Sequence, residues 1–519
     1  MFCTGKREKS MLARLNSVTL SGIDGLICEV EVDVARGGFE KAVIVGLPDA
    51  AVKESSERVK SAIVNSGYKY PKTQSLVNLA PADVKKAGPA FDLPIALGML
   101  MGQGILAGGD CKNFVIVGEL ALDGRVRGVN GVLSMAMTAA ENGFRRMIVP
   151  LENAREAAVV EDIEVYGVGS LAQAAAFLQG QLLLETTTVD IEQLFNVAGN
   201  YEVDFADVKG QESVKRALTV AAAGGHNIMM IGPPGAGKTM LSQRMATILP
   251  PLALKESLET TRVYSSVGLL EKGTALIATR PVRAPHHTAS GPALVGGGTN
   301  PRCGELSLAH HGILFLDEFA EFPRHVLEMI RQPLEDGVVT VSRARAAMTF
   351  PAQFMLVAAM NPCPCGYFGI DARRCRCTPG QIERYLSKVS GPLVDRIDIH
   401  VDVPPITFTR LRSKASQTGS AAMRNDVVRA REVQRQRFGD GKVTANSRMS
   451  HKQVRKFCEL DSACEMMLKQ AMTEFALSAR AHDKICKVAR TIADMDGSNA
   501  IGPEHIAEAI SYRKLDRKL

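Results

Sequence analysis

The feature that most constrains the fold is a glycine-rich segment, GPPGAGKT, at residues 232–239. An apolar run, NIMMI, precedes it, and a helical stretch, MLSQRMATIL, follows it. Glycines allow backbone N–H groups to turn toward phosphate oxygens, and the start of a helix adds the positive end of its dipole. A strand, such a loop and a helix predict an α/β nucleotide-binding unit, with Lys238 at the β and γ phosphates and the Thr239 hydroxyl on Mg²⁺.

Two further apolar runs end in polar residues. GILFLDE at 312–318 predicts a central strand that ends at Asp317, which would hold the Mg²⁺, and Glu318, which would polarise the attacking water. MLVAA at 355–359 predicts another strand, followed closely by Asn361. In this class of ATPase a polar residue there senses the γ-phosphate, and a turn or helix-cap asparagine is the alternative. Together with the loop, these segments predict hydrolysis of Mg-ATP.

Two arginines are candidates for completing this site. In SGPLVDRIDIHVDVP at 390–404, Arg396 is expected to enter a neighbouring subunit's site as an arginine finger and to stabilise transition-state charge. The alternative is a surface ion pair with Asp395 or Asp398. Arg480 lies at the expected start of a helix, which suits a second phosphate sensor on a lid.

The length of 519 residues exceeds what one hydrophobic core usually serves and favours several domains. Up to about residue 180, short β-rich runs at 27–34, 41–45, 114–117 and 147–149 alternate with helical stretches such as 51–66 and 132–142, which predicts an α/β domain. A Thr-containing stretch without a clear period follows, and the chain beyond residue 406 is helical and charged. The expected order is an extension (1–10), an α/β domain (11–180), a linker (181–200), an α/β ATPase core (201–405) and a helical lid (406–519).

Neither the first ten residues nor the most apolar window of the chain suggests a membrane segment. The first ten residues, MFCTGKREKS, lack the apolar segment of a signal peptide, and the most apolar window, 91–109, contains Asp92, Gln103 and several glycines. A cytoplasmic protein without a membrane partner is therefore expected. The net charge of +7 fits a polyanion partner and an ordinary soluble surface equally well.

Four segments resemble the YifB/ComM family of magnesium-chelatase-like AAA+ proteins: DFADVKGQESVKRAL, GGHNIMMIGPPGAGKTM, RPVRAPHHTASGPALVGGG and AHHGILFLDEFAEFP. The match covers essentially the whole chain from Met11. The resemblance implies a hexameric ring that works on DNA, like the helicases of this family that promote branch migration of recombination intermediates during natural transformation, or competence. It implies that Asn361, Arg396 and Arg480 are sensor 1, arginine finger and sensor 2, with 207–211 along the adenine. The implied nucleotide contacts are Val208, Gly210, Gly232, Pro233, Pro234, Gly235, Ala236, Gly237, Lys238, Thr239 and Met240.

The domain at 11–180 resembles the Lon protease domain. NLAPADVKKAGPAFDLPIAL is similar to the segment that carries Lon's serine, and residues 118–153 are similar to the one that carries its lysine. Here the serine position falls at Ala90 and the lysine position at Leu133, and Ser134 points elsewhere. Without a hydroxyl nucleophile and an amine base, Ser-Lys proteolysis is excluded. A non-catalytic scaffold or DNA-contact domain is expected.

Three arginines are candidates for contacts to DNA phosphates. Residues 337–350, GVVTVSRARAAMTF, alternate like a β-hairpin, and in relatives that thread nucleic acid a hairpin here faces the pore, which singles out Arg343 and Arg345. The loop 296–304 adds Arg302. Residues 410–456 contain thirteen Lys and Arg against three acids. The partner would be branched or single-stranded DNA, and the alternative for each feature is a solvated surface.

A cysteine cluster, NPCPCGYFGIDARRCRCT at 361–378, contains Cys363, Cys365, Cys375 and Cys377 in two C-x-C pairs. Four thiolates on a short loop suit tetrahedral Zn²⁺, although C-x-C is tighter than the usual spacing. Structural zinc is favoured over free thiols, without a catalytic role. His286 and His287, which follow Pro285, are expected to be structural or to contact a neighbouring subunit, and a metal site is the alternative.

Three functions compete. The leading hypothesis is an ATP-driven DNA translocase that moves branch points. The second is a chelatase-type motor that remodels a protein partner for Mg²⁺ insertion into a porphyrin, against which stands the Lon-like domain that chelatase motor subunits lack. The third is an ATP-dependent protease, which the residues Ala90 and Leu133 oppose.

Overall fold

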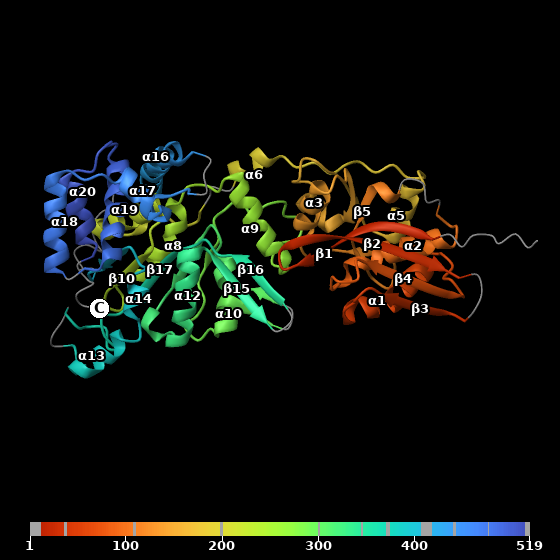
Figure 1. The fold of residues 1–519 in the computed structure, drawn as a ribbon, viewed down its shortest axis with the longest axis horizontal. Coiled ribbons are helices and arrows are strands. Elements are labelled where there is room, and N and C mark those ends of the chain that lie inside the picture. Colours follow the sequence, from red (N-terminus) through yellow and green to blue (C-terminus); the bar gives the residue numbers. More distant parts are fainter. Residues whose placement is uncertain are drawn as a thin grey trace, which may run out of the picture. The chain divides into compact units, whose positions relative to one another are not determined.

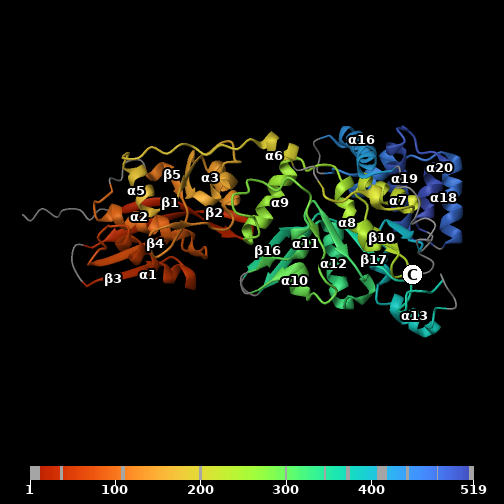
Figure 2. The same cartoon turned by 180° about the vertical axis from the view of Figure 1, so that it is seen from behind.

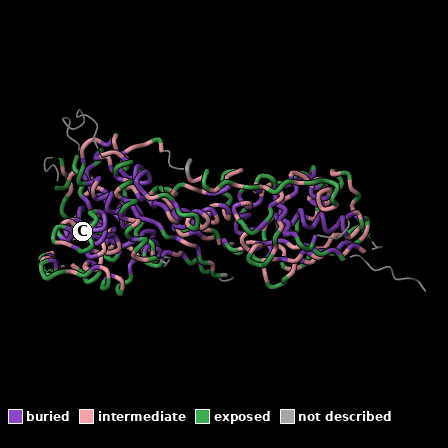
Figure 3. Tube along the Cα trace, turned by 90° about the horizontal axis from the view of Figure 1, so that it is seen from above, coloured by how far each residue is buried: buried purple, intermediate pink, exposed green. Residues whose placement is uncertain are grey.

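The structure is a computed structural model that describes residues 12–35, 39–106, 111–195, 201–298, 301–342, 347–369, 374–405, 418–439, 443–475 and 477–513, with the backbone alone at 196, 197, 343 and 346. Contacts divide the chain into two units. The first unit comprises residues 1–196 and 257–277, and the second comprises 197–256 and 278–519. Figure 3 shows buried residues running through the interior of each unit.

A seven-stranded mixed sheet forms the centre of the first unit, in the order β3-β4-β2-β1-β5-β8-β9. β2 pairs antiparallel with both β1 and β4. The other pairs are parallel: β3 with β4, β1 with β5, β5 with β8, and β8 with β9. The expected β-rich runs at 27–34, 41–45, 114–117 and 147–149 all lie in this sheet. Its strands are β1 (Ala13–Ser21), β2 (Asp24–Val34), β3 (Lys41–Val45), β4 (Gln74–Ala80), β5 (Phe114–Ile116), β8 (Arg146–Pro150) and β9 (Glu164–Val168), beside a small ribbon of β6 (Glu119–Leu120) and β7 (Val126–Arg127).

Helices cover both faces of this sheet, because successive strand residues point to opposite sides. Phe114 and Ile116 pack with α1, α2 and α5, whereas Val115 between them packs with α3 and α4. The helices at 51–66 and 132–142 were expected and are confirmed within a residue or two. They are α1 (Ala50–Asn65), α2 (Asp92–Gly102), α3 (Val132–Glu141), α4 (Ala154–Ala157) and α5 (Leu171–Leu178).

Two segments outside the expected α/β domain also pack on the first unit. The backbone N–H of Thr187 donates to the Val165 carbonyl at 2.9 Å, and helix α6 (Ile191–Val197) follows within the stretch expected as linker. Residues 257–277, from the range expected for the ATPase core, begin inside α9 (Leu254–Ser266). The Gly131 N–H donates to the Ser265 carbonyl at 3.1 Å, and Leu276 packs against Leu133.

A five-stranded parallel sheet organises the second unit, in the order β11-β14-β17-β10-β18. All four residues of β10 are buried, as expected for a strand covered on both faces. Figures 1 and 2 show β10 and β17 beside α8. The elements are α7 (Glu212–Gly224), β10 (Ile228–Ile231), α8 (Lys238–Ile248), β11 (Val282–Arg283), β14 (Ile313–Leu316), β17 (Met355–Met360), α13 (Pro379–Leu386), α14 (Gly391–Val394) and β18 (Ile399–Asp402).

Two hairpins project from this core. β12 (Gly296–Gly297) pairs with β13 (Arg302–Cys303), between α10 (Gly291–Val295) and α11 (Glu305–Leu308). β15 (Val338–Arg343) pairs with β16 (Ala346–Pro351) after α12 (Arg324–Asp336), which confirms the hairpin expected at 337–350.

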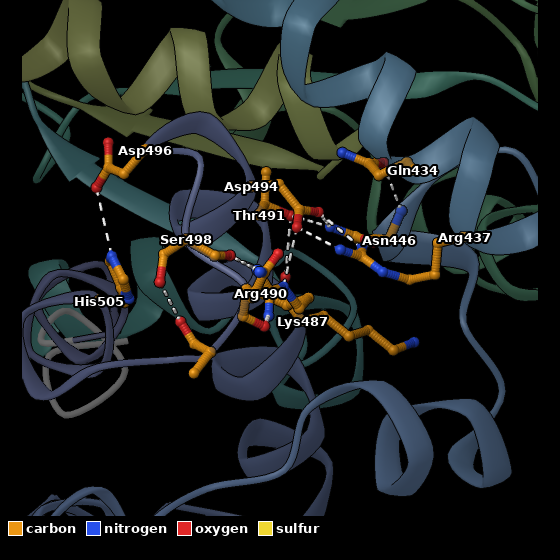
Figure 4. A network of polar contacts seen from close by, with 12 residues as sticks. Gln434, Arg437, Asn446, Lys487, Arg490, Thr491, Asp494, Asp496, Ser498 and His505 are labelled. Carbon is orange, nitrogen blue, oxygen red and sulfur yellow. Dashed lines mark hydrogen bonds and ion pairs between the residues drawn. The ribbon is translucent and has the colours of Figure 1, made fainter.

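Beyond residue 417 the described residues form five α-helices, and the buried carboxylate of Asp494 on α19 (Ala479–Met495) joins this helix to α16 (Ser420–Phe438). Asp494 accepts hydrogen bonds from Arg437, from Arg490 Nε at 2.9 Å and from Asn446 Nδ2 at 2.8 Å, as Figure 4 shows. Asn446 also donates to Thr491 Oγ1, which contacts His226 Nε2 at 2.8 Å in the core. The helices are therefore fixed to the core by polar pairs as well as by apolar packing. They are α16 (Ser420–Phe438), α17 (His451–Phe457), α18 (Ser462–Glu474), α19 (Ala479–Met495) and α20 (Pro503–Ser511). Among the described residues, no helix combines the length and apolarity needed to cross a membrane.

Candidate functional site

The segment 232–237 connects β10 to α8 and confirms the expected order of strand, loop and helix. Gly235 and Gly237 adopt φ values of +76° and +85°, a region that glycine enters without steric cost. A Cβ at Gly232 would lie 2.4 Å from the Val403 carbonyl oxygen, beside β18. Glycine is therefore required at three loop positions for backbone reasons alone.

Lys238 folds back over this loop. Its Nζ donates to the carbonyls of Gly232 at 2.7 Å and Pro233 at 3.0 Å, and to Asn361 Oδ1 at 3.1 Å. Burial lowers the pKa of Lys238, while Asp317 and Glu318 act in the opposite direction. The ammonium group thus joins the loop to the end of β17.

The two acids follow β14 at the same edge of the sheet. The Thr239 hydroxyl donates to Asp317 Oδ2 at 2.6 Å, and the Glu318 N–H donates to Asp317 Oδ1 at 2.9 Å. Glu318 has a φ of +51°, in the left-handed region that side chains rarely adopt. Carboxyl ends of neighbouring parallel strands form the ligand-binding edge of open α/β sheets, and these groups converge there.

A cavity of about 400 Å³ lies between these groups. It brings together most of the residues expected at the phosphates. Its lining consists of Pro234, Gly235, Ala236, Gly237, Lys238, Thr239, Met240, Asp317, Glu318, Met360 and Asn361.

The segment expected along the adenine supports the loop from behind. Val208 is fully buried, and Gly210 has a φ of +69°. Gln211 Nε2 donates to the Ala236 carbonyl at 2.8 Å and to the Pro404 carbonyl at 3.2 Å. None of these three residues lines the cavity, and the bracing by Gln211 had no separate signal in the sequence.

The two candidate arginines lie away from the cavity lining. Arg396 Nη2 is 2.7 Å from Glu335 Oε1, and its side chain is only 11% exposed. The ion pair considered with Asp395 or Asp398 is therefore formed with Glu335 on α12 instead, a partner distant in sequence. Arg480 is exposed in the first turn of α19.

His287 was not expected at this site, yet its Nδ1 lies 3.1 Å from Glu318 Oε2. Its ring packs edge-on against Phe322, with centroids 6.4 Å apart, and lies 4.1 Å from the ring of His286. A His-His pair after a proline carries no periodic signal, so the contact between His287 and Glu318 was not predictable from local sequence pattern.

The candidates for DNA contacts are described only in part. Arg302 is exposed on β13. Arg343 ends β15, but its side chain and the whole of Arg345 lie outside the described residues.

The four cysteines at 363–377 converge, each offering a sulfur within 4.8 Å of the others. The Sγ atoms of Cys363 and Cys365 are 3.4 Å apart, and those of Cys365 and Cys375 are 3.7 Å apart. Zn–S bonds of about 2.3 Å in a tetrahedron give sulfur–sulfur edges of roughly 3.8 Å, so the donor set fits Zn²⁺. Hydrogen bonds from backbone groups lower the pKa of Cys365 to about 6. A Cβ at Gly366 would lie 2.4 Å from Pro234 Cδ, so this loop abuts the phosphate loop.

The first unit contains a larger cavity, of about 570 Å³, lined among others by Arg127, Glu152, Glu156 and Lys272. Glu156 Oε1 accepts hydrogen bonds from the Leu133 N–H at 2.8 Å and from the Ser265 hydroxyl. Ala90 and Leu133 are buried and do not line this cavity.

Comparison with known proteins gives a consistent result. Three family models match: "Magnesium chelatase, subunit ChlI" at 204–411, "Subunit ChlI of Mg-chelatase" at 30–153 and "Magnesium chelatase, subunit ChlI C-terminal" at 417–513. Competence protein ComM of Haemophilus influenzae is 43% identical over 512 residues, which cover 98% of each chain. The proteins called YifB of Escherichia coli and Salmonella typhimurium are 42% and 40% identical, over 96% and 98% of each chain.

Proposed function

Because the chain belongs to the ComM/YifB family of magnesium-chelatase-like AAA+ proteins, we propose that it is an ATPase that drives a motor on DNA. The observation that carries the ATPase part is the convergence of Lys238, Asp317 and Asn361 at the carboxyl edge of the parallel sheet. The family suggests ATPase activity, and this convergence supports assigning the activity to these residues.

Each residue has a role that follows from its chemistry. The N–H groups of the loop and Lys238 bind the β and γ phosphates, and Asn361 senses the γ-phosphate. The Thr239 hydroxyl would ligate Mg²⁺ and Asp317 would hold the ion through its water shell, because hard oxygen donors suit this ion and the two side chains are neighbours, joined by a hydrogen bond of 2.6 Å. Mg²⁺ supplies charge neutralisation at the phosphates. Glu318 polarises the attacking water.

The remaining roles rest on the family resemblance. Val208 and Gly210 support the adenine side, Arg480 serves as sensor 2 on a C-terminal helical lid, and Arg396 serves as the finger of a hexameric ring. For Arg396 to reach the nucleotide site of a neighbouring subunit, its ion pair with Glu335 has to break. The residues 11–180 form a non-catalytic Lon-like domain, and the cysteine cluster holds a structural zinc.

The DNA part of the proposal is supported by a relative named for competence, 43% identical over nearly the whole chain, and by the exposed Arg302 in a hairpin of the ATPase unit. A chelatase-type motor that remodels a protein partner is the second candidate, and the names of the matching family models favour it.

ATP turnover by the purified chain, with and without a four-way DNA junction at low salt, tests the proposal. We expect the junction to raise turnover severalfold and Glu318→Gln to abolish it. Turnover that Glu318→Gln abolishes but that no DNA changes would retain the ATPase and favour the protein-remodelling motor. Turnover unaffected by Glu318→Gln would contradict the assigned site.

A mixing experiment tests the ring. Chains with Lys238→Ala and chains with Arg396→Ala are inactive alone, but together they form sites with an intact lysine from one chain and an intact arginine from its neighbour. Recovered turnover supports a finger that acts between subunits. No recovery means that Arg396 acts within its own chain.

A further inference from the structure

The segment that carries the cysteine cluster also touches the candidate ATPase site. Asn361, just before the cluster, lines the cavity and accepts a hydrogen bond from Lys238 at 3.1 Å. Gly366, within the cluster, lies so close to the phosphate loop that a Cβ there would be 2.4 Å from Pro234 Cδ. Pro234 itself lines the cavity. A change of shape at the cysteines therefore bears directly on the nucleotide site.

The backbone between the first two cysteines and the phosphate loop is tightly held. The Gly366 N–H donates to the Cys363 carbonyl at 2.9 Å, and the Phe368 N–H donates to Cys363 Sγ at 3.4 Å. Gly366 has a φ of +84°, which side chains rarely allow. Because Gly366 follows Cys365 directly and already lies against Pro234, a displacement of Cys365 is passed on to the phosphate loop.

The four thiols differ in how easily a dissolved reagent reaches them. Cys363 is buried, whereas Cys365, Cys375 and Cys377 are partly exposed. The Sγ atoms of Cys365 and Cys375 lie 3.7 Å apart, at the two ends of the segment 365–375. Two sulfurs at this separation need only a small movement of the backbone to form a disulfide bond. Cys365 and Cys375 are therefore an accessible pair, and a bond between them would draw the ends of this segment together.

A peroxide is the class of oxidant that forms such a bond. The Cys365 thiolate attacks one oxygen of hydrogen peroxide, the O–O bond breaks, and a sulfenic acid and hydroxide form. The Cys375 thiolate then attacks the sulfenic sulfur, forms the S–S bond and displaces a second hydroxide. The two sulfurs lose two electrons, and the peroxide, with two protons from solvent, becomes two water molecules. Once two of the four thiolates are consumed, too few ligands remain to hold Zn²⁺.

We propose that Cys365 and Cys375 are a redox modification site, at which a peroxide forms a disulfide that displaces the phosphate loop through Gly366 and Pro234 and so lowers ATP turnover. The inference rests on the proposed ATPase function for its effect on turnover, and it goes beyond that function because it gives the cysteine cluster a role other than holding a structural metal.

The experiment uses the full chain, purified with reductant, freed of it, treated with hydrogen peroxide and then with catalase. We expect peptide mapping by mass spectrometry to find the disulfide between Cys365 and Cys375, and a chromogenic chelator to detect released Zn²⁺. ATP turnover should fall about tenfold to a hundredfold, the scale of a misplacement of about 1 Å in an active site. Dithiothreitol with Zn²⁺ should restore it, whereas it would not reverse oxidation of Met240 or Met360 in the same cavity.

Two variants control for the site of oxidation. Turnover by Cys375→Ser, whatever its starting value, should not change with peroxide, because the second sulfur is absent. Cys303→Ser removes a thiol outside the cluster and should respond as the wild type does. If Cys375→Ser does not fold, the mapped disulfide and the turnover of the wild type decide the question.

A disulfide between Cys365 and Cys375 without a change in turnover would overturn this inference and leave the proposed function in place. A fall in turnover without this disulfide, or with the same peroxide sensitivity in Cys375→Ser, would overturn it as well. A reduced wild-type chain that does not hydrolyse ATP would overturn the proposed function and the inference together.

Discussion

Both units contain a cavity with charged walls, of about 570 Å³ in the first unit and about 400 Å³ in the second. In the first, the charges pair with one another: Lys272 with Glu152 at 3.1 Å and Arg127 with Glu119 at 3.6 Å, while Glu156 accepts bonds from its own unit. In the second, an ammonium, a hydroxyl and two carboxylates converge on one open space. Convergence of unlike groups, more than volume, distinguishes a candidate site from a gap between packed elements.

The largest expected difference between the two cavities is in turnover. Lys238→Ala removes the charge at the phosphates and should lower kcat about a thousandfold, the scale of one preorganised donor in a water-poor site. Lys272→Ala removes the lysine of the first cavity, which is 80% exposed, and should leave kcat unchanged. Steady-state ATPase assays measure both, and a comparable loss in Lys272→Ala would end the distinction.

Buried carboxylates also differ between the units, in their dependence on pH. Burial raises the pKa of Asp92 to about 6, against the opposing effect of Arg58. The contribution of Asp92 to the free energy of unfolding is fully present below pH 3.8, the ordinary pKa of the group, and is lost as pH rises through 6. This contribution is roughly 3 kcal/mol. Asp92→Asn should remove this slope from urea unfolding of the first unit.

In the second unit, stability depends on pH with the opposite sign at Asp398. Although burial opposes it, Lys484 at 2.7 Å holds the pKa of Asp398 well below its usual value, so its stabilisation is lost only in acid. For the first unit, if the free energy of unfolding of Asp92→Asn still changes between pH 4 and 6, another group of that unit titrates in this range.

Zinc binding is the next property that should differ between the two units. The cysteine cluster belongs to the second unit, so Cys363→Ser should reduce bound zinc from about one ion per chain to none and lower only that unit's melting temperature, by about 5 °C. Elemental analysis and calorimetry measure this, with Cys303→Ser, outside the cluster, as the control that keeps its zinc. A zinc-free wild-type chain would favour the reading as free thiols.

The smallest effect concerns the link between Lys238 and β17. Asn361→Ala removes an acceptor 3.1 Å from the ammonium and should lower kcat about tenfold, with nucleotide binding retained. Single-turnover kinetics separate the two steps. A loss of binding instead would mean that Asn361 shapes the loop and does not sense the phosphate.

Much of the fold follows from local pattern. Apolar runs at β10, β14 and β17 and the glycine-rich loop report backbone requirements within a few residues, so their strands and the convergence of their ends were predictable. The contacts of Arg396 with Glu335, of His287 with Glu318 and of Gln211 with Ala236 join residues far apart in the chain. Such pairings are decided by tertiary packing, which periodicity and spacing do not encode.

Because residues 257–277 belong to the first unit, gene segments for the two units cannot be exchanged independently between related proteins. The chain passes between the units at residues 196, 256 and 277, so the first unit is assembled from two separate stretches of the gene. Deleting residues 1–196 would leave Leu276 and Ser265 without Leu133 and Gly131, their partners. The N-terminal part is thus no detachable module, and recombination that transfers only one part leaves each with an incomplete interior.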